Sequence, residues 1–338
     1  MYKLNFKQAM LSCLVLSSTS AFAADPNHLE MPHSAGTAMV EYKFMRMNME
    51  GLQSGKDSVS NDTALSMMGN NHLMIPTKMT MDMHMLMPMY NFTRDTSIMM
   101  MATYMTNKMD MEMRAMGSNP PAVMDMETSG LGDTSISINH KFADELFAAS
   151  FEVSIPTGSI DEKATTMMNG MAMEATAPYP MQLGSGTYDV KPSLTYLGAY
   201  YDLRFGAQAS YKLRTGENDN GYTLGDEAEV LTWVRKPVFG VILDAELRVK
   251  KWGAIDGKDS SISTMDLSMN NGMMTGKASP TSFPTNTGGT IGTLSVGATL
   301  PIGFNYIGAD VTIPVYQDLN GLQMKRKTSA SISLIAHF

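Results

Sequence analysis

The segment Leu203–Arg214, LRFGAQASYKLR, alternates between two kinds of side chain along its whole length. Its odd positions carry Leu, Phe, Ala and Tyr, whereas its even positions carry Arg, Gly, Gln, Ser and Lys. A period of two places one set on each face of a β-strand. The segment Val241–Lys250, VILDAELRVK, repeats this design. Both segments therefore predict strands with one face toward an apolar phase and the other toward a polar one.

The same alternation recurs along the chain and predicts about twelve strands in total. The further strands are expected near 38–49, 77–91, 95–114, 134–142, 147–155, 188–196, 227–235, 294–300, 307–315 and 324–338. Their connections alternate strictly between short turns, as at 143–145 and 301–303, and long loops, as at 115–132, 157–185 and 252–289. Short turns at one end and long loops at the other, on an even number of strands, are typical of outer-membrane barrels.

We therefore predict an all-β fold, a transmembrane antiparallel up-and-down β-barrel of about 12 strands that covers residues 38–338. The chain ends at Phe338, and a terminal aromatic residue on an alternating strand is typical of proteins inserted by the barrel-assembly machinery. Closure of the sheet removes its edges, so we expect a monomer. A soluble β-sandwich is the alternative architecture.

The N-terminus has the pattern of an export signal. Lys3 and Lys7 precede a short apolar run, and Ala21-Phe22-Ala23 supplies the small residues that signal peptidase reads. We expect a signal peptide over 1–23, a periplasmic segment over 24–37, and a mature protein in the cell outer membrane, in contact with its lipid. Cys13 is the single cysteine of the chain, so the mature protein has neither disulfides nor thiolate chemistry.

Composition narrows the functional classes. Lys and Arg number 25 against 33 Asp and Glu, a balance that argues against nucleic-acid binding. The mean hydropathy is −0.12, which does not fit a bundle of transmembrane helices. The six histidines lack a nearby serine in a nucleophile motif, and His140 and Ser137 are three positions apart, on opposite faces of a strand. We therefore expect no enzymatic activity and no resident cofactor.

Methionine is the most unusual residue of the composition, with 36 in 338. On the strand predicted near 95–114, one parity forms a ladder on the side of the lumen: Met99, Met101, Met105, Met109, Met111 and Met113. Between residues 79 and 89 every second residue is also Met, and its flanking parity leaves open whether this set faces lumen or lipid. The methionines are either flexible apolar filler, an adaptable lining for apolar solutes, or soft thioether ligands for Cu(I) or Ag(I), with His84 as a further ligand.

Charged side chains on the polar faces of the strands are predicted to line the lumen. They are Glu41, Lys43, Asp189, Lys191, Arg204, Lys212, Arg214, Glu229, Arg235, Asp244, Glu246 and Arg248. They form either an internal network of salt bridges or a constriction that selects solutes.

Three motifs carry a family resemblance: IPTGSID at 155–161, YPMQLGSGTYD at 179–189 and GYTLGD at 221–226. From about Thr134 to Phe338 the chain resembles the outer-membrane transporters named after the meta pathway of phenol degradation, and its Met-x-Met region resembles a Met-rich branch of them. The resemblance implies a barrel with a transport or channel role, and it carries over no binding residue. We expect the solutes to be small hydrophobic or aromatic compounds, or soft metal ions such as Cu(I), the latter because of the methionines. A plugged barrel with a structural or surface-binding role is the alternative.

Overall fold

The computed structural model describes residues 34–65, 72–113, 122–168, 171–262 and 278–338. The predicted signal peptide at 1–23 and most of the predicted segment 24–37 lie outside the described residues. No helix in the described part of the chain is long and apolar enough to cross a membrane.

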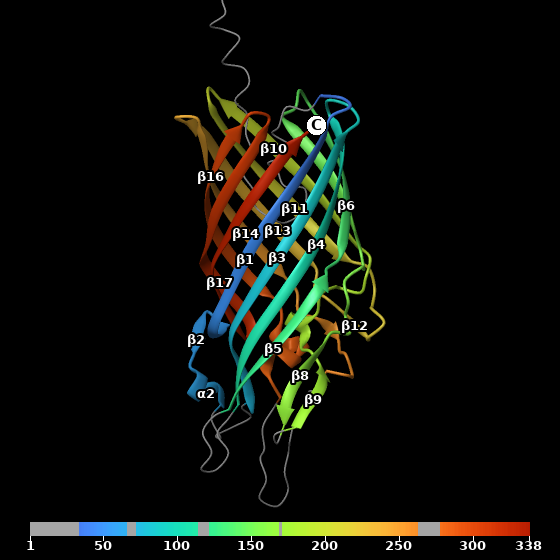
Figure 1. Cartoon of the computed structure of the whole chain (residues 1–338), viewed down its shortest axis with the longest axis vertical. Coiled ribbons are helices and arrows are strands. Elements are labelled where there is room, and N and C mark those ends of the chain that lie inside the picture. Colours follow the sequence, from blue (N-terminus) through green and yellow to red (C-terminus); the bar gives the residue numbers. More distant parts are fainter. Residues whose placement is uncertain (1–33, 66–71, 114–121, 169–170, 263–277) are drawn as a thin grey trace, which may run out of the picture.

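One antiparallel sheet closes on itself and forms a barrel (Figure 1). In order around the barrel, its elements are β1 (Ala38–Gly55), β3 (Met74–Asn91), β4 (Thr96–Met113), β6 (Thr134–Phe142), β7 (Phe147–Ile155), β10 (Asp189–Tyr200), β11 (Leu203–Arg214), β13 (Glu227–Val238), β14 (Val241–Trp252), β16 (Gly289–Ile302) and β17 (Asn305–His337). Pairing of β17 with β1 closes the circle, from Met39 opposite His337 to Gly55 opposite Leu319. The predicted fold class is confirmed.

The long element β17 crosses the wall twice. Its first part, up to Leu319, pairs with β16, and the remainder pairs with β1. Contacts between the two parts show that they lie side by side: the Ser331 hydroxyl donates a hydrogen bond to Asp310, and the backbone of Arg326 is hydrogen-bonded to the side chain of Gln317. Over the described residues the wall therefore has twelve antiparallel segments, in agreement with the sequence pattern.

The two ends of the barrel differ in their connections. Short turns join the strands at the end that holds the C-terminus, shown at the top of Figure 1. Between β13 and β14 the turn is only Phe239-Gly240, with φ of 52° and 83°, as the right-handed twist of a tight hairpin requires. The opposite end holds the longer connections, which carry α2 (Asn61–Leu65), β2 (Asp57–Val59), β12 (Tyr222–Thr223), β15 (Asp256–Gly257) and three short 3₁₀ helices.

Two predicted loops contain strands that the sequence pattern did not indicate. Ala122–Leu131, in the loop expected at 115–132, forms β5, which pairs with the second half of β4, whereas β6 pairs with the first half. In the loop expected at 157–185, β8 (Lys163–Met168) and β9 (Met171–Thr176) form a hairpin. In β5 the outward positions include Asp125 and Glu127, so the apolar outer face that marks a membrane strand is missing.

The inward and outward faces follow the predicted parity. On β14 the outward Leu243, Leu247 and Val249 are exposed, whereas the inward Glu246 is buried. Aromatic rings form a chain on the outer surface near the short turns, from Phe142 through Phe147 and Tyr196 to Phe205, with ring centroids 5.6 to 6.4 Å apart. An aromatic girdle at this level is typical of a barrel in a membrane.

Candidate functional site

Two chemically different walls face each other across the lumen. The first, named here the methionine wall, is built by three neighbouring strands whose methionines share the inward face. Its members are Met39, Met45, Met47 and Met49 on β1, Met79, Met81, Met83, Met85, Met87 and Met89 on β3, and Met99, Met101, Met105, Met109, Met111 and Met113 on β4. Most of these side chains are buried. The sequence left open whether the methionines between residues 79 and 89 face the lumen or the lipid, and the structure places them on the side of the lumen.

The strand register aligns these methionines in rungs across the wall. In the middle rung Met45 lies opposite Met83, which lies opposite Met105. With the end of the short turns taken as the lower end of the barrel, although Figure 1 shows it at the top, a lower rung joins Met39, Met89 and Met99. An upper rung joins Met49, Met79 and Met109 and continues to Met126 of β5. Directly opposite residues in an antiparallel pair have Cβ atoms about 4.5–5.5 Å apart. Each rung therefore brings three or four thioethers together.

The structure corrects the grouping of His84 with the methionines. His84 lies on the outward face of β3, where its Nδ1 is 2.8 Å from the Tyr42 hydroxyl and its ring packs against Phe44 with centroids 5.0 Å apart. The methionines on either side of it, Met83 and Met85, point inward. Neighbours in a strand alternate between faces, so a histidine at this position cannot join the ladder.

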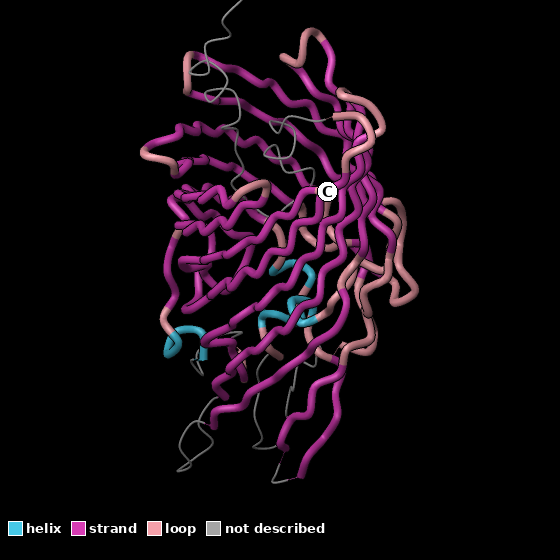
Figure 2. Tube along the Cα trace, turned by 45° about the horizontal axis from the view of Figure 1, so that its top comes forward, coloured by secondary structure: helices cyan, strands magenta, loops and turns pink. Residues whose placement is uncertain are grey.

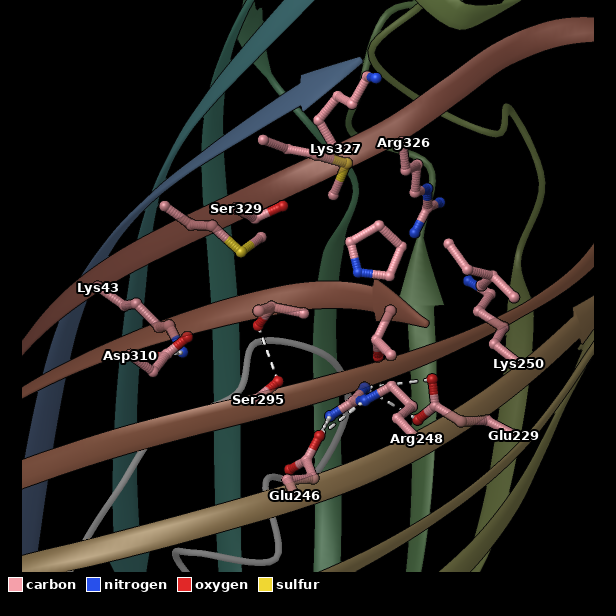
Figure 3. A pocket seen from close by; sticks show the side chains of 16 residues that line it. Lys43, Glu229, Glu246, Arg248, Lys250, Ser295, Asp310, Arg326, Lys327 and Ser329 are labelled. Carbon is pink, nitrogen blue, oxygen red and sulfur yellow. Dashed lines mark hydrogen bonds and ion pairs between the residues drawn. The ribbon is translucent and has the colours of Figure 1, made fainter. Parts of the chain in front are cut away.

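The second wall is charged. Arg248 of β14 lies between two glutamates, with its guanidinium 3.1 Å from Glu229 and 2.9 Å from Glu246 (Figure 3). Lys250 pairs with Glu227 on β13. The two walls meet at Lys43, whose ammonium lies 3.4 Å from the carboxylate of Asp310. Arg248, Glu229 and Glu246 thus form one internal cluster of salt bridges, and Lys43 with Asp310 forms a separate pair. A role of these charges in selecting solutes stays a prediction.

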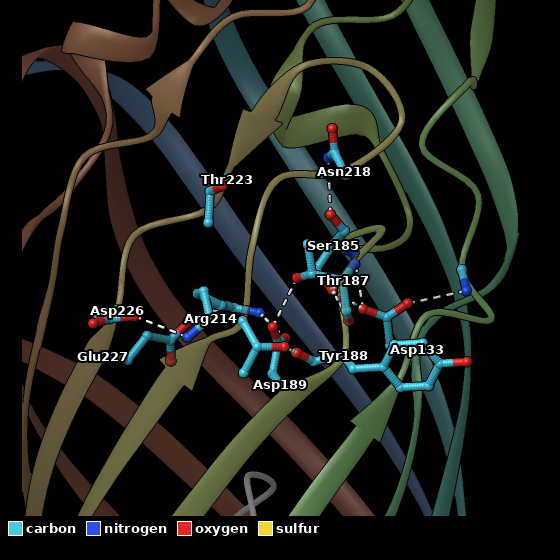
Figure 4. A network of polar contacts seen from close by, with 12 residues as sticks. Asp133, Ser185, Thr187, Tyr188, Asp189, Arg214, Asn218, Thr223, Asp226 and Glu227 are labelled. Carbon is cyan, nitrogen blue, oxygen red and sulfur yellow. Dashed lines mark hydrogen bonds and ion pairs between the residues drawn. The ribbon is translucent and has the colours of Figure 1, made fainter.

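A second polar network ties the long connections to the barrel (Figure 4). Arg214 contacts Asp189 at 2.5 Å and Glu227 at 2.8 Å, and Thr187 donates to Asp189 at 2.8 Å. Asp133 accepts hydrogen bonds from Ser185 and from the backbone NH of Gly158. Residues of the motifs at 155–161 and 179–189, which carry the family resemblance, therefore hold loops in place at this end of the lumen.

The remaining predicted charged positions also lie on the inward face. Glu41, Asp189, Lys191 and Arg235 are buried there, and Arg204, Lys212 and Asp244 are half-buried. Their role in solute passage stays a prediction. The sequence-based set omitted Glu227, Lys250 and Asp310, although charges on the polar face of an alternating strand were the signal that identified the others.

A cavity of about 90 Å³ separates the two walls near the middle of the lumen. Met45, Met47 and Lys43 border it on one side. The opposite border includes Glu229, Glu246, Arg248 and Lys250, with Ser295 and Thr312 between the two sides. The volume holds several water molecules, and its walls offer thioethers and paired charges to the same occupant.

Loop segments cover the lumen at the end with the long connections. The helix η1 (Tyr179–Met181) places Met181, fully buried, against the upper methionines. Tyr179 packs edge-on against Tyr222 with centroids 5.1 Å apart, and burial raises the pKa of Tyr222 to about 12. The helix η2 (Pro280–Ser282) contacts both β3 and β17, and η3 (Pro284–Asn286) follows it. Figure 2 shows short helical segments within the outline of the strands at this end.

A closed up-and-down sheet with an apolar belt outside, short turns at one end and long connections at the other is the fold of outer-membrane β-barrels. An outer membrane channel from Pseudomonas putida F1 has a similar structure, with a TM-score of 0.57 and 12% identity over 90% of this chain and 97% of that chain. The β domain of the Bordetella autotransporter BrkA matches with a TM-score of 0.46 and 9% identity, over 90% of this chain and 100% of that chain.

A TodX monoaromatic hydrocarbon channel mutant matches with a TM-score of 0.44 and 7% identity, over 92% of this chain and 91% of that chain. No family model matches the sequence, and no curated protein matches it. At these identities the likeness to the Pseudomonas structure establishes the fold of the chain and leaves its activity to be argued from its own residues.

Proposed function

We propose that this protein is an outer-membrane channel that passes small solutes through its lumen. In this proposal the signal peptide at 1–23 directs export, the barrel-assembly machinery inserts the chain, and the barrel works as a monomer surrounded by outer-membrane lipid. The observation that carries the proposal is the cavity between the walls, because a barrel with a purely structural role has no need of an interior lined by two chemistries. The fold shared with an outer membrane channel supports it.

The lining indicates which solutes the channel would accept. Met45 and Met47 offer a polarizable, flexible surface that adapts to apolar shapes, whereas Arg248 and its glutamates offer hydrogen-bond donors and acceptors. We keep two substrate classes, small hydrophobic or aromatic compounds and soft metal ions such as Cu(I). The TodX protein is a monoaromatic hydrocarbon channel, and at 7% identity its likeness to this chain does not choose between these classes.

The loop segments that cover the lumen around Met181, named here the cap, are expected to limit conduction. Met181 is fully buried against Met79 and Met109, so the variant Met181→Asp places an unpaired carboxylate in an apolar site and releases this part of the cap. We expect discrete conductance steps for the refolded protein in a planar bilayer, and a larger or longer-lived open state for Met181→Asp. Met181→Leu, which keeps the apolar volume, is the matched control and should conduct like the parent chain.

Heat-modifiable mobility in SDS gels checks that each variant still forms a closed barrel. If folded parent chain and folded Met181→Asp both fail to conduct, the channel proposal is rejected and the plugged barrel with a surface-binding role takes its place.

A further inference from the structure

We propose that the middle of the methionine wall is a binding site for a soft monovalent metal ion, Cu(I) or its analogue Ag(I), held by the thioethers of Met45, Met83 and Met105. The site goes beyond the channel activity and does not rest on it, because an ion can bind in the lumen whether or not solutes cross.

The first support is that methionine follows one face of the strands. The outward positions that flank the middle rung carry other residue types: Phe44 and Arg46 on β1, Asp82 and His84 on β3, and Tyr104 and Thr106 on β4. Within the stretches 39–49, 79–89 and 99–113, Met100 is the one methionine on the outward face. If methionine served only as apolar filler, Leu, Ile and Val would serve on the inner face as they do outside. The bias therefore indicates a property of the thioether itself.

The second support is the composition and geometry of the cluster. The buried residues that pack together at the middle rung are Met45, Met47, Met83, Met85 and Met87, and the partly buried hydrophobic residues that join them are also methionines. Neighbouring Cβ atoms of a rung are about 4.5–5.5 Å apart, and Met83 stands between Met45 and Met105. Each side chain has three rotatable bonds, so the two outer sulfurs can reach across toward that of Met83 and three sulfurs can converge on one ion. Thioethers are soft ligands that select Cu(I) over harder cations.

The third support is access, which distinguishes the middle rung from the other two. Met45 and Met47 border the central cavity, so an ion in the lumen meets their sulfurs directly. The upper rung is enclosed by Leu52, Ile75 and Met181, and the lower rung packs against Ile335. The middle rung is thus the place where the methionine wall meets open space.

The charged side chains that line the cavity beside the cluster are five cationic ones, Lys43, Arg248, Lys250, Arg326 and Lys327, and three carboxylates, Glu229, Glu246 and Asp310. The proposed site therefore depends on the softness of the thioethers and not on electrostatic attraction. On the methionine wall, Glu41 and Lys43 lie next to the middle rung, and Lys43 is paired with Asp310. Across the cavity Arg248 is paired with Glu229 and Glu246. Arg326 lies over the ring of Trp252, with 5.7 Å between the guanidinium carbon and the centroid.

The test measures Ag(I) binding to the full, detergent-solubilised barrel in chloride-free buffer by calorimetry. We compare the parent chain with the triple variant Met45→Leu, Met83→Leu, Met105→Leu. Leu keeps the apolar volume and removes the sulfur. We expect the triple variant to lose about tenfold or more in affinity, since each lost ligand weakens a site built of three.

The matched control removes three thioethers at another height, by Met39→Leu, Met89→Leu and Met99→Leu. This control should bind Ag(I) like the parent chain. The absence of Ag(I) binding by the parent chain overturns the proposal, and so does an equal loss in both triple variants, which would indicate diffuse binding to exposed thioethers. X-ray absorption of the Cu(I) complex adds a direct readout, since a first shell with no sulfur scatterers also overturns it. Conductance of the same preparations is scored separately, so failure of the channel proposal is distinguishable from failure of the site.

Discussion

Arg248 offers a quantitative test of the charged wall. Its guanidinium contacts Glu229 on the neighbouring strand and Glu246 two positions earlier on its own strand, and the side chains of both glutamates are 6% exposed. The variant Arg248→Gln leaves two buried carboxylates facing each other with their shared cation removed. Removal of one partner from a buried ion pair costs about 3–5 kcal/mol. Water in the adjacent cavity lowers this cost, so we expect about 3 kcal/mol, roughly a hundredfold in the folding equilibrium.

Urea unfolding in lipid vesicles measures this loss, with fluorescence of the two tryptophans, Trp233 and Trp252, as the signal. The triple variant Arg248→Gln, Glu229→Gln, Glu246→Gln removes the repulsion and should recover at least half of the lost stability. An Arg248→Gln protein within about 0.5 kcal/mol of the parent, or a triple variant that is no more stable than the single one, would refute the view that this arginine holds the two carboxylates in place.

Two further predictions concern packing and ionisation. A Cβ atom at Gly206 would lie 2.2 Å from a ring carbon of Trp233. The variant Gly206→Val should therefore displace this indole, lower the free energy of unfolding by about 1–3 kcal/mol and shift the tryptophan emission. An unchanged emission spectrum would contradict this packing. Burial raises the pKa of Tyr222 to about 12, so its contribution to stability is complete below pH 10, the ordinary pKa, and is lost as the pH rises through 12. In an absorbance titration the variant Tyr222→Phe should lose one of the late-titrating tyrosines of the parent chain. Identical late titrations of variant and parent would argue against a buried hydroxyl at Tyr222.

The faces of most strands could be predicted from the sequence, because alternation fixes which residues share a side. The inward position of Glu229, Arg248 and their charged neighbours follows from parity alone. Residues 77–91 were ambiguous because the outward positions change character along β3, from Lys78 and Asp82 at one end to Leu86 and Tyr90 at the other. One strand passes through two environments, so the rule that the lipid face is apolar fails over half its length. The polar outer face of β5 concealed that strand for the same reason.

The rungs could not be predicted, because they depend on the register between strands. Register follows from the lengths and conformations of the connections and from packing of all the strands together, and one residue of slip would move a whole set to the other face. The grouping of Arg248 with Glu229 rather than with another acid has the same origin. The grouping of His84 with the methionines was wrong because residues adjacent in a strand, such as His84 and its neighbours Met83 and Met85, lie on opposite faces.

The methionine wall comes from one continuous stretch of sequence within residues 38–131. The ion-pair partners of Arg248 and Arg214 lie much later in the chain, the first of them being Asp189. In an up-and-down barrel each strand lies beside its neighbours in the chain, so the stretch meets the rest of the wall at only two seams, β1 with β17 and β4 with β6. A recombination event that exchanged this block would replace the methionine wall in a single step and leave the salt bridges of Arg248 and Arg214 untouched. In such a barrel the chemistry of the inner face can therefore be exchanged in blocks without rebuilding the rest of the wall.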